Sequence, residues 1–433
     1  MMAAALYSLV PELAQTELDG TLKGIPFDSK LRLAELPEQG WNVARGDLPL
    51  PVLTLSDKPL RANLATMQQY CERERVRLAP HGKTTMSPQL FAAQLEAGAW
   101  GLTAATPTQV AVMRRQGIAR IILANELIEP GALCWIAEEL ERDPDFEFFC
   151  LVDSAASAQA MERVLAAQRP PRPLQVLVEL GGHGGRAGVR TSAAALEVAQ
   201  AVAACDHLSL AGIECYEGTL ANTTDAAALT RIDQLFTVVR ESLLELCAAG
   251  LITREEIILT AGGSVYFDRV IAALRDWSQL ARPVSLVLRS GCYLSHDHGS
   301  YEARSPLAGR RPEDEQLRLH NAMTLWAAVL SRPEPELAIV GAGIRDLGTD
   351  SGLPQARAQL REGTELRTLT GLTETYRVMD QHLFLRLPTE LDLRPGDILS
   401  FDLSHPCTNF DKFRFIPVID PDANVIDGIL TCF

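Results

Sequence analysis

The chain has 433 residues, of which 47% are hydrophobic and 22% are charged, and its formal net charge is −15 at pH 7. This is the composition of a globular protein without the basic block that a nucleic-acid partner requires, and no apolar run reaches the roughly 20 residues of a membrane helix. Nine cysteines are scattered without a CxxC pair, and the first residues lack the basic region of a signal peptide, so we expect reduced thiols and a cytoplasmic protein.

From about residue 51, short β-branched apolar runs alternate with alanine-rich segments of helical periodicity, which is the pattern of repeated βα units. Ser, Thr or Thr-Pro opens the helical segments, and Gly closes the first two, as helix caps do. Eight such strands over about 250 residues favour a TIM (β/α)8 barrel over a doubly wound sheet. The predicted strands are residues 76–80, 100–104, 120–123, 146–152, 175–179, 210–215, 257–260 and 285–288.

The alternation stops after about residue 322. Apolar runs such as "ELAIVGAG", "LFLRL" and "RFIPVID" follow without long helical patterns between them, which indicates a mostly β domain. The sequence therefore predicts an α/β protein with a barrel at 50–322 and a β domain at 323–433, to which part of 1–49 is assigned.

A single lysine follows the first predicted barrel strand. Lysine occurs only at positions 23, 30, 58, 83 and 412, and Lys83 stands in "APHGKTTMSP". The carboxyl ends of barrel strands carry the chemistry, and period-two geometry would place His81 and Lys83 on one face there. An amine at this place suits Schiff-base chemistry, which arginine cannot perform; a lysine that only reaches solvent is the ordinary alternative.

Glycine-rich turns follow the later strands. "VELGGHGGRAGVR" contains Arg186, and "CYEG" contains Tyr216. "TAGGS" and "RSGCY" follow strands seven and eight, where barrels commonly bind phosphate with backbone N–H groups. A lysine after strand one and a phosphate site after the late strands describe pyridoxal phosphate held in a barrel. The residues of the last two turns are Gly262, Gly263, Ser264, Gly291 and Cys292.

The segment "LSHPCTNFDKF" near the C-terminus contains His405 and Cys407. Imidazole and thiolate are zinc-type ligands, and two of them would form an open site completed by water and substrate. Chance occurrence of a His-x-Cys pair is the alternative. The loop "SHDHGSY" after strand eight either adds polar groups to the mouth of the barrel or is a solvated loop.

In this order, the motifs resemble those of the fold type III pyridoxal-phosphate enzymes, and among them the D-threonine aldolase and D-serine dehydratase group. The resemblance implies an alanine-racemase-like barrel, a C-terminal β domain and a homodimer. It also implies that Lys83 carries the cofactor, with His81 close by, that Arg186 lies near the pyridine nitrogen and that Tyr216 faces the cofactor. The turns with Gly262 and Gly291 would surround the phosphate, and His405 with Cys407 would hold a divalent metal, zinc or manganese.

Within that group, as the resemblance implies, His-x-Cys is typical of dehydratases and His-x-Asp of aldolases. We therefore expect a dehydratase that converts a β-hydroxy D-amino acid, such as D-serine, into a 2-oxo acid and ammonia. The alternatives are a D-threonine aldolase that releases glycine and an aldehyde, an amino-acid racemase, a non-catalytic pyridoxal-phosphate carrier, and a metal-dependent barrel hydrolase without the cofactor. In each enzymatic case the partner is a small molecule.

Overall fold

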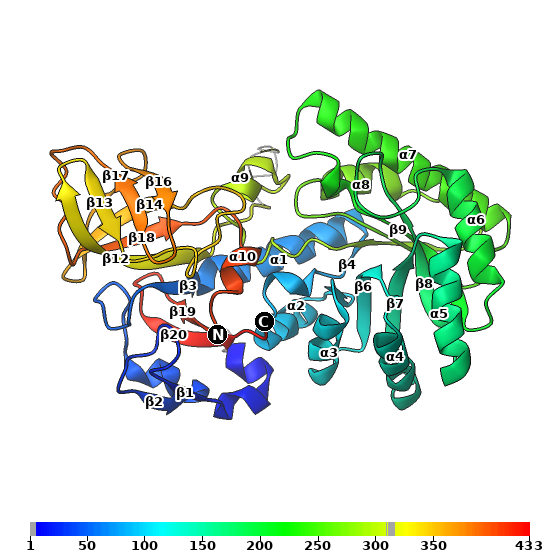
Figure 1. Ribbon diagram of the computed structural model, residues 1–433, viewed down its shortest axis with the longest axis horizontal. Helices are drawn as coiled ribbons and strands as arrows, with labels where there is room; N and C mark the ends of the chain where they lie inside the picture. The colour runs from blue at the N-terminus through cyan, green and yellow to red at the C-terminus, as the bar shows by residue number, and fades with distance from the viewer. Residues whose placement is uncertain (1–5, 309, 311–316) are drawn as a thin grey trace. The chain divides into compact units, whose positions relative to one another are not determined.

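Figure 1 shows a computed structural model of the chain, in which residues 6–308, 310 and 317–433 are described. The chain divides into two compact units. The barrel unit comprises Gln68–Lys83 and Gly98–Gly291. The β unit comprises Met1–Met67, Thr84–Ala97 and Cys292–Phe433.

The barrel unit contains eight parallel strands in the order β4-β11-β10-β9-β8-β7-β6-β5. A parallel bridge between His81, just after β4, and Thr103 in β5 joins the two ends of this order, so the sheet closes on itself. The predicted (β/α)8 barrel with a second, mostly β domain is thereby confirmed. The strands are β4 (Arg77–Leu78), β5 (Leu102–Ala104), β6 (Arg120–Glu126), β7 (Glu147–Val152), β8 (Leu174–Leu180), β9 (Leu208–Cys215), β10 (Ile257–Ala261) and β11 (Val284–Leu288).

Helices lie outside these strands (Figure 1). Of the predicted caps, Thr106 and Thr191 form the expected side-chain hydrogen bond, whereas Ser87 precedes its helix without one. The side chains of Thr106, Ser154, Thr191 and Asp225 each accept a hydrogen bond from a backbone N–H in the first turn that follows. The helices are α3 (Pro107–Arg115), α4 (Pro130–Arg142), α5 (Ala155–Gln168), α6 (Ser192–Ala203), α7 (Ala226–Ala248) and α8 (Phe267–Leu274), with a 3-10 turn η5 (Glu217–Thr219); α1 (Asp57–Glu74) contains the boundary between the units.

Apolar side chains from successive strands fill the barrel. The cluster takes at least one residue from each of the six strands β6 to β11 and Ala79 from the chain after β4, and all its members are at most 1% exposed. This packing leaves a solid core and no pore, so chemistry is confined to the ends of the strands. The cluster consists of Ala79, Ile122, Phe149, Leu151, Leu177, Ala211, Ile258 and Val287.

The β unit is built on strands in the order β15-β14-β18-β12-β13-β17-β16, and β3 pairs with both β12 and β19. The long strand β12 was not among the predicted runs, because "MTLWAAVL" carries no signal that separates a strand from a helix. The strands are β3 (Val52–Ser56), β12 (Met323–Glu334), β13 (Leu337–Val340), β14 (Gln355–Arg361), β15 (Thr364–Thr368), β16 (Glu374–Val378), β17 (Leu383–Arg386), β18 (Ile398–Asp402), β19 (Phe415–Ile419) and β20 (Val425–Leu430).

Residues from both ends of the chain share the core of the β unit. Leu33 and Val52 pack in one cluster with Trp326 and Phe415. This packing fixes the N-terminal segment on the C-terminal strands. The remaining elements of the unit are β1 (Glu17–Asp19), β2 (Lys30–Arg32), α2 (Pro88–Glu96), α9 (Ser300–Arg304), α10 (Cys407–Phe410) and the 3-10 helices η1 (Leu6–Leu9), η2 (Pro11–Gln15) and η3 (Leu33–Gln39).

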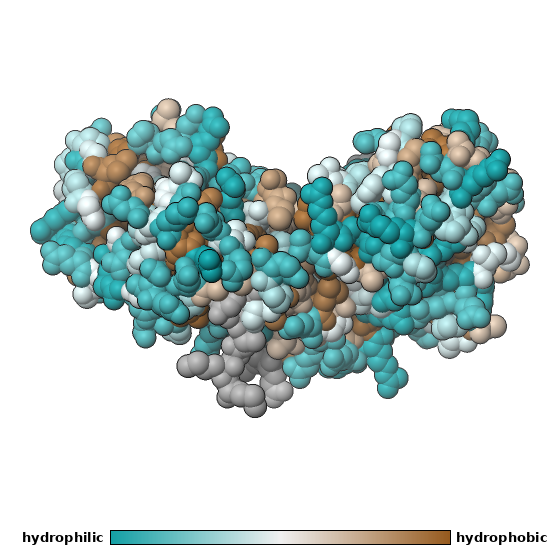
Figure 2. Space-filling view, turned by 90° about the horizontal axis from the view of Figure 1, so that it is seen from below, coloured by the Kyte–Doolittle hydropathy of each residue, from teal (hydrophilic) through white to brown (hydrophobic). Residues whose placement is uncertain are grey.

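On the face drawn in Figure 2, hydrophilic residues predominate and hydrophobic ones are dispersed among them. Within the described part of the chain, no helix combines the length and the apolar character that a membrane span needs.

Gly212 in β9 offers a test of the barrel. Its φ is +156°, and a Cβ at this position would overlap the carbonyl oxygen of Ile258 on the neighbouring strand. We expect Gly212→Ala to lower the free energy of unfolding by at least about 2 kcal/mol, measured by urea denaturation. Gly131→Ala is the control, because a Cβ at Gly131 meets nothing within 4 Å. Equal effects of the two substitutions would contradict the close approach of β9 and β10.

Candidate active site

Lys83 lies in the short 3-10 turn η4 (Gly82–Thr84), directly after the strand end that closes the barrel. Strand β4 is shorter than predicted, and the turn at Gly82 ends the period-two geometry between His81 and Lys83. The side chain of Lys83 is exposed, whereas Nδ1 of His81 is buried without a hydrogen-bond partner. Desolvation, followed by the charges of Lys83 and Arg289, holds the pKa of His81 well below its usual value, so its ring is neutral.

Arg186 and Tyr216 come together although they follow different strands. Arg186 lies in the glycine-rich turn after β8, and Tyr216 follows β9 directly. The guanidinium carbon of Arg186 is 5.3 Å from the centroid of the Tyr216 ring, which is a cation–π distance. The two side chains therefore form one polar and aromatic surface in the barrel unit.

A side chain of the protein itself binds the backbone amides of the glycine turn after β10. The Glu217 carboxylate accepts hydrogen bonds from the backbone N–H groups of Gly262, at 3.2 Å, and Gly263, at 2.8 Å. Glu217 therefore occupies two of the backbone donors that were predicted to bind a phosphate. The hydroxyl of Ser290 binds the carbonyl oxygen of Gly263 at 2.8 Å and ties this turn to the one that contains Gly291.

A cluster of carboxylates at the ends of the barrel strands was not found from the sequence. It consists of Glu126 on β6, Glu179 on β8 and Glu214 on β9, and each has an oxygen that is buried without a partner. Glu214 forms a buried ion pair with Arg289, whose guanidinium also donates to the Thr260 hydroxyl at 3.0 Å. A glutamate within an apolar strand, as in "VEL" or "IEC", is the signal that could have found it.

Three metal-ligand side chains meet in the β unit. The side-chain donor atoms of Cys292, His405 and Cys407 all lie within 4.8 Å of one another. The Sγ atoms of Cys292 and Cys407 are 3.5 Å apart. The hydroxyl of Thr84 is 3.4 Å from the Cys407 sulfur and 3.8 Å from the Cys292 sulfur. The thiol of Cys292 therefore joins the predicted His-x-Cys pair, although its residue was assigned to the phosphate turn.

Asp350 orients the imidazole of His405. Its Oδ2 atom is 2.5 Å from His405 Nδ1, and the Thr408 hydroxyl donates to its other oxygen. The amide side chain of Asn409 in α10 donates to the His405 carbonyl oxygen and accepts from the backbone N–H of Gly348 at 2.9 Å. A carboxylate bound to one imidazole nitrogen and a metal on the other is the usual arrangement at histidine metal sites. Asp350 lies in "DLGTDSGLP" and was not among the predicted site residues.

The electrostatics of this cluster favour a positive charge. Burial lowers the pKa of His405, but hydrogen bonds and charge interactions with Cys292 and Asp350 outweigh burial and raise it to about 9. The hydrogen bond with Cys407, burial and the charge of Cys407 raise the pKa of Cys292 well above its usual value. Two adjacent thiolates therefore repel each other unless a cation lies between them.

The loop "SHDHGSY" has structural partners in the β unit. His296 Nε2 is 3.1 Å from Glu302, and Asp297 accepts from the backbone N–H groups of Gly299 and Tyr301. Tyr301 approaches the metal-ligand cluster, with its ring centroid 5.8 Å from that of His405.

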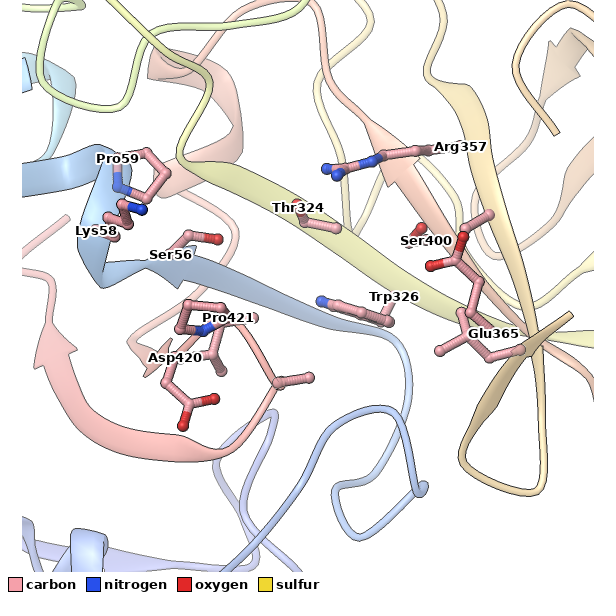
Figure 3. Close-up of a pocket in the computed structure, with 14 residues that line it drawn as sticks. Ser56, Lys58, Pro59, Thr324, Trp326, Arg357, Glu365, Ser400, Asp420 and Pro421 are labelled. Carbon is pink, nitrogen blue, oxygen red and sulfur yellow. The ribbon is translucent and has the colours of Figure 1, made fainter. Parts of the chain in front are cut away.

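A separate pocket of about 390 Å³ lies in the β unit (Figure 3). Its lining includes Lys58 and Arg357, together with Glu365 and Asp420. None of the predicted site residues line it. It is therefore not the candidate active site.

The residues present fit both predicted groups. For pyridoxal phosphate, the barrel unit offers an exposed amine at Lys83, the unpartnered buried atom His81 Nδ1 and the surface formed by Arg186 and Tyr216. For a divalent metal, the donor set of two sulfurs and one nitrogen in the β unit is of the zinc type.

Comparison with known proteins identifies the class. Residues 56–256 match the family described as "Alanine racemase, N-terminal domain", and residues 322–419 match "Putative serine dehydratase domain". The solved structure of a D-threonine aldolase from Filomicrobium marinum is 25% identical with a TM-score of 0.73, covering 90% of this chain and 96% of that chain.

Two relatives carry different activities in their names. A D-threonine aldolase of Arthrobacter sp is 25% identical over 394 residues, 91% of this chain and 91% of that protein. A D-threo-3-hydroxyaspartate dehydratase of Delftia sp. (strain HT23) is 32% identical over 143 residues, 33% of this chain and 36% of that protein. The family matches and the relatives indicate a barrel enzyme of the pyridoxal-phosphate type. The chain belongs to the alanine-racemase-like group of fold type III pyridoxal-phosphate enzymes.

Glu179 provides a test through pH. Burial, a hydrogen bond with Glu126 and the charge of Glu214 raise the pKa of Glu179 to about 10. The folded chain therefore keeps a proton that the unfolded chain releases above its ordinary pKa, and wild-type stability falls as pH rises through that interval. We expect Glu179→Gln to gain stability over the wild type progressively between about pH 5 and about pH 9, in urea denaturation of the cofactor-free chain.

Glu147→Gln is the control of opposite sign. Burial raises the pKa of Glu147, but hydrogen bonds from Arg254 and Arg120 outweigh this and lower it, so its charge stabilises the fold above its unfolded pKa. This variant should be less stable than the wild type at neutral pH, and the difference should shrink on acidification. A stability difference for Glu179→Gln that does not change with pH would contradict the protonated carboxyl.

Proposed function

We propose that the protein is a pyridoxal-phosphate- and divalent-metal-dependent lyase of β-hydroxy D-amino acids that acts as a dehydratase. The observation that carries the proposal is the cluster of Cys292, His405 and Cys407 in a chain in which Lys83 lies in the turn after the first barrel strand.

The residues of the barrel unit would hold the cofactor and move the first proton. Lys83 would bind it covalently, and the surface of Arg186 and Tyr216 would hold its ring. When bound, pyridoxal phosphate supplies an electron sink for negative charge at the α-carbon of the substrate. The ε-amine of Lys83 would accept the α-proton, and the neutral ring of His81 adds no positive charge beside that amine.

In the proposed reaction, the residues of the β unit would assist the loss of the β-hydroxyl. Hydroxide is a poor leaving group, and a divalent metal held by the cluster supplies a Lewis acid for the charge on the β-oxygen. Loss of the α-proton and the β-hydroxide gives an enamine, which takes up water and yields a 2-oxo acid and ammonia. D-serine and D-3-hydroxyaspartate are the substrates we propose first.

The second candidate is the aldolase reaction, favoured by the aldolase relative and by the aldolase structure. It would start from the same bound substrate, but the β-hydroxyl would lose its proton while the bond between the α- and β-carbons breaks. The products would be glycine and an aldehyde. We place the dehydratase first because the chain has cysteine two residues after His405, which the resemblance links to dehydratases.

The products distinguish the two reactions. We expect D-serine or D-3-hydroxyaspartate to give ammonia and a 2-oxo acid, measured with dehydrogenase-coupled assays, at rates at least about 100-fold above those of Lys83→Ala. Lys58→Arg is the matched control, since Lys58 lies in the separate pocket. Glycine and an aldehyde as the main products would assign the aldolase. A colourless protein in which borohydride fixes no adduct on Lys83 would end the pyridoxal-phosphate proposal.

Metal removal tests the role of the β unit. We expect chelation to reduce ammonia release by about 100-fold or more, because the β-oxygen loses its Lewis acid, and zinc or manganese to restore it. The cofactor absorption should remain, since Lys83 belongs to the barrel unit. Full activity in a chain shown by elemental analysis to be metal-free would contradict the proposed function of His405 and Cys407.

A further inference from the structure

The main chain of Cys292 belongs to the glycine turn after β11, but its side chain lies in the metal-ligand cluster. The residue follows Gly291 at the end of the segment after β11, where a phosphate site was predicted. Its side chain is buried, with 5% of the residue exposed, and the sulfur lies against the sulfur of Cys407. A thiol is not a phosphate-binding group. The position of this sulfur therefore indicates that it binds a different ligand.

We propose that Cys292 is a third protein ligand of the metal, so that Cys292, His405 and Cys407 form a two-cysteine, one-histidine zinc site. The inference rests on the metal role proposed for His405 and Cys407 and deepens it, because it assigns the ligand set and the metal.

The distances suit tetrahedral zinc. Two sulfurs at about 2.3 Å from one zinc ion, at the tetrahedral angle, are separated by about 3.8 Å. The sulfurs of Cys292 and Cys407 are 3.5 Å apart, and no donor atom of the cluster is more than 4.8 Å from another. The two sulfurs would need to move apart by only about 0.3 Å to reach the spacing of zinc ligands.

The neighbours of the cluster hold the ligands in position. Asp350 binds His405 Nδ1 at 2.5 Å, which leaves Nε2 for a metal and fixes the ring. The hydroxyl of Thr84, a residue only 2% exposed, lies within 3.8 Å of both sulfurs and can donate a hydrogen bond to a thiolate. Both kinds of contact are expected around metal ligands.

The ligand set also determines which metal binds and what it can do. Two thiolates and an imidazole favour zinc over manganese or magnesium, which prefer oxygen donors. Three protein ligands leave the fourth tetrahedral position for water or a substrate oxygen, which is the pattern of catalytic zinc. Among the described residues, the group has no fourth histidine, cysteine or carboxylate ligand.

The wild-type chain gives the first test. The protein is freed of metal with a chelator, reloaded with zinc alone and measured by zinc K-edge X-ray absorption. We expect two sulfur neighbours at about 2.3 Å and nitrogen or oxygen neighbours at about 2.0–2.1 Å. A fit with one sulfur or none would overturn the proposal, and this measurement needs no variant that has to fold.

Cobalt(II) in place of zinc gives the second test, since sulfur-to-cobalt charge-transfer absorption scales with the number of cobalt–thiolate bonds. We expect Cys292→Ser and Cys407→Ser each to lose about half of this absorption and to weaken zinc binding by about 100-fold or more in competition with a chromophoric chelator. Cys134→Ser is the matched control, because Cys134 lies in α4 of the barrel unit outside the cluster. Unchanged absorption and affinity in Cys292→Ser would overturn the proposal.

The outcome can be separated from that of the proposed function. The borohydride adduct on Lys83 and the assay of products report on the lyase reaction and do not depend on how many sulfurs bind zinc. A zinc ion with two sulfur ligands in a chain that releases neither ammonia nor aldehyde would support this inference and contradict the lyase. A Cys292–Cys407 disulfide in the metal-free chain, found by mass spectrometry together with no uptake of zinc under reducing conditions, would overturn the inference alone.

Discussion

The closure of the parallel sheet by main-chain hydrogen bonds between β4 and β5 is the constraint on which the barrel depends. Trp100 N–H donates to the Leu78 carbonyl at 2.7 Å, and Thr103 N–H donates to the Pro80 carbonyl at 2.9 Å. These bonds turn an eight-stranded sheet into a ring, so that all strand carboxyl ends meet on one rim. Lys83 therefore lies on the rim that also carries Arg186 and the carboxylate cluster, although more than 100 residues separate Lys83 from Arg186 in the sequence.

The rim is unusually acidic for a site that would bind a phosphorylated cofactor. Glu217 occupies the two amides of the glycine turn, and Glu214 is buried against Arg289. A buried carboxylate is costly unless it is paired with a cation or protonated. Glu214 is paired with Arg289, whereas the raised pKa of Glu179 favours its protonated form. Binding of a dianionic phosphate would therefore alter the protonation of the rim together with its contacts.

The repeating units and single chemical groups could be predicted from the sequence, because local patterns encode them. The eight barrel strands follow from alternation and capping, and Lys83 stands out by composition. The contacts of His405 with Asp350 and of Cys292 with Cys407 could not be predicted, since each joins residues more than 50 positions apart. Strand β12 was missed for a related reason: its run "MTLWAAVL" suits a helix as well as a strand, and its pairing partners include the distant strands β3 and β18.

The scarcity of lysine has a practical consequence for protein chemistry. No lysine lies between Lys83 and Lys412, so a lysine-specific protease releases one long fragment that begins at Thr84. A covalently occupied Lys83 would resist cleavage, and that fragment would then be extended by residues 59–83, provided that the bond before Pro59 is cut. The state of one amine in the barrel rim is thereby converted into a difference in fragment mass.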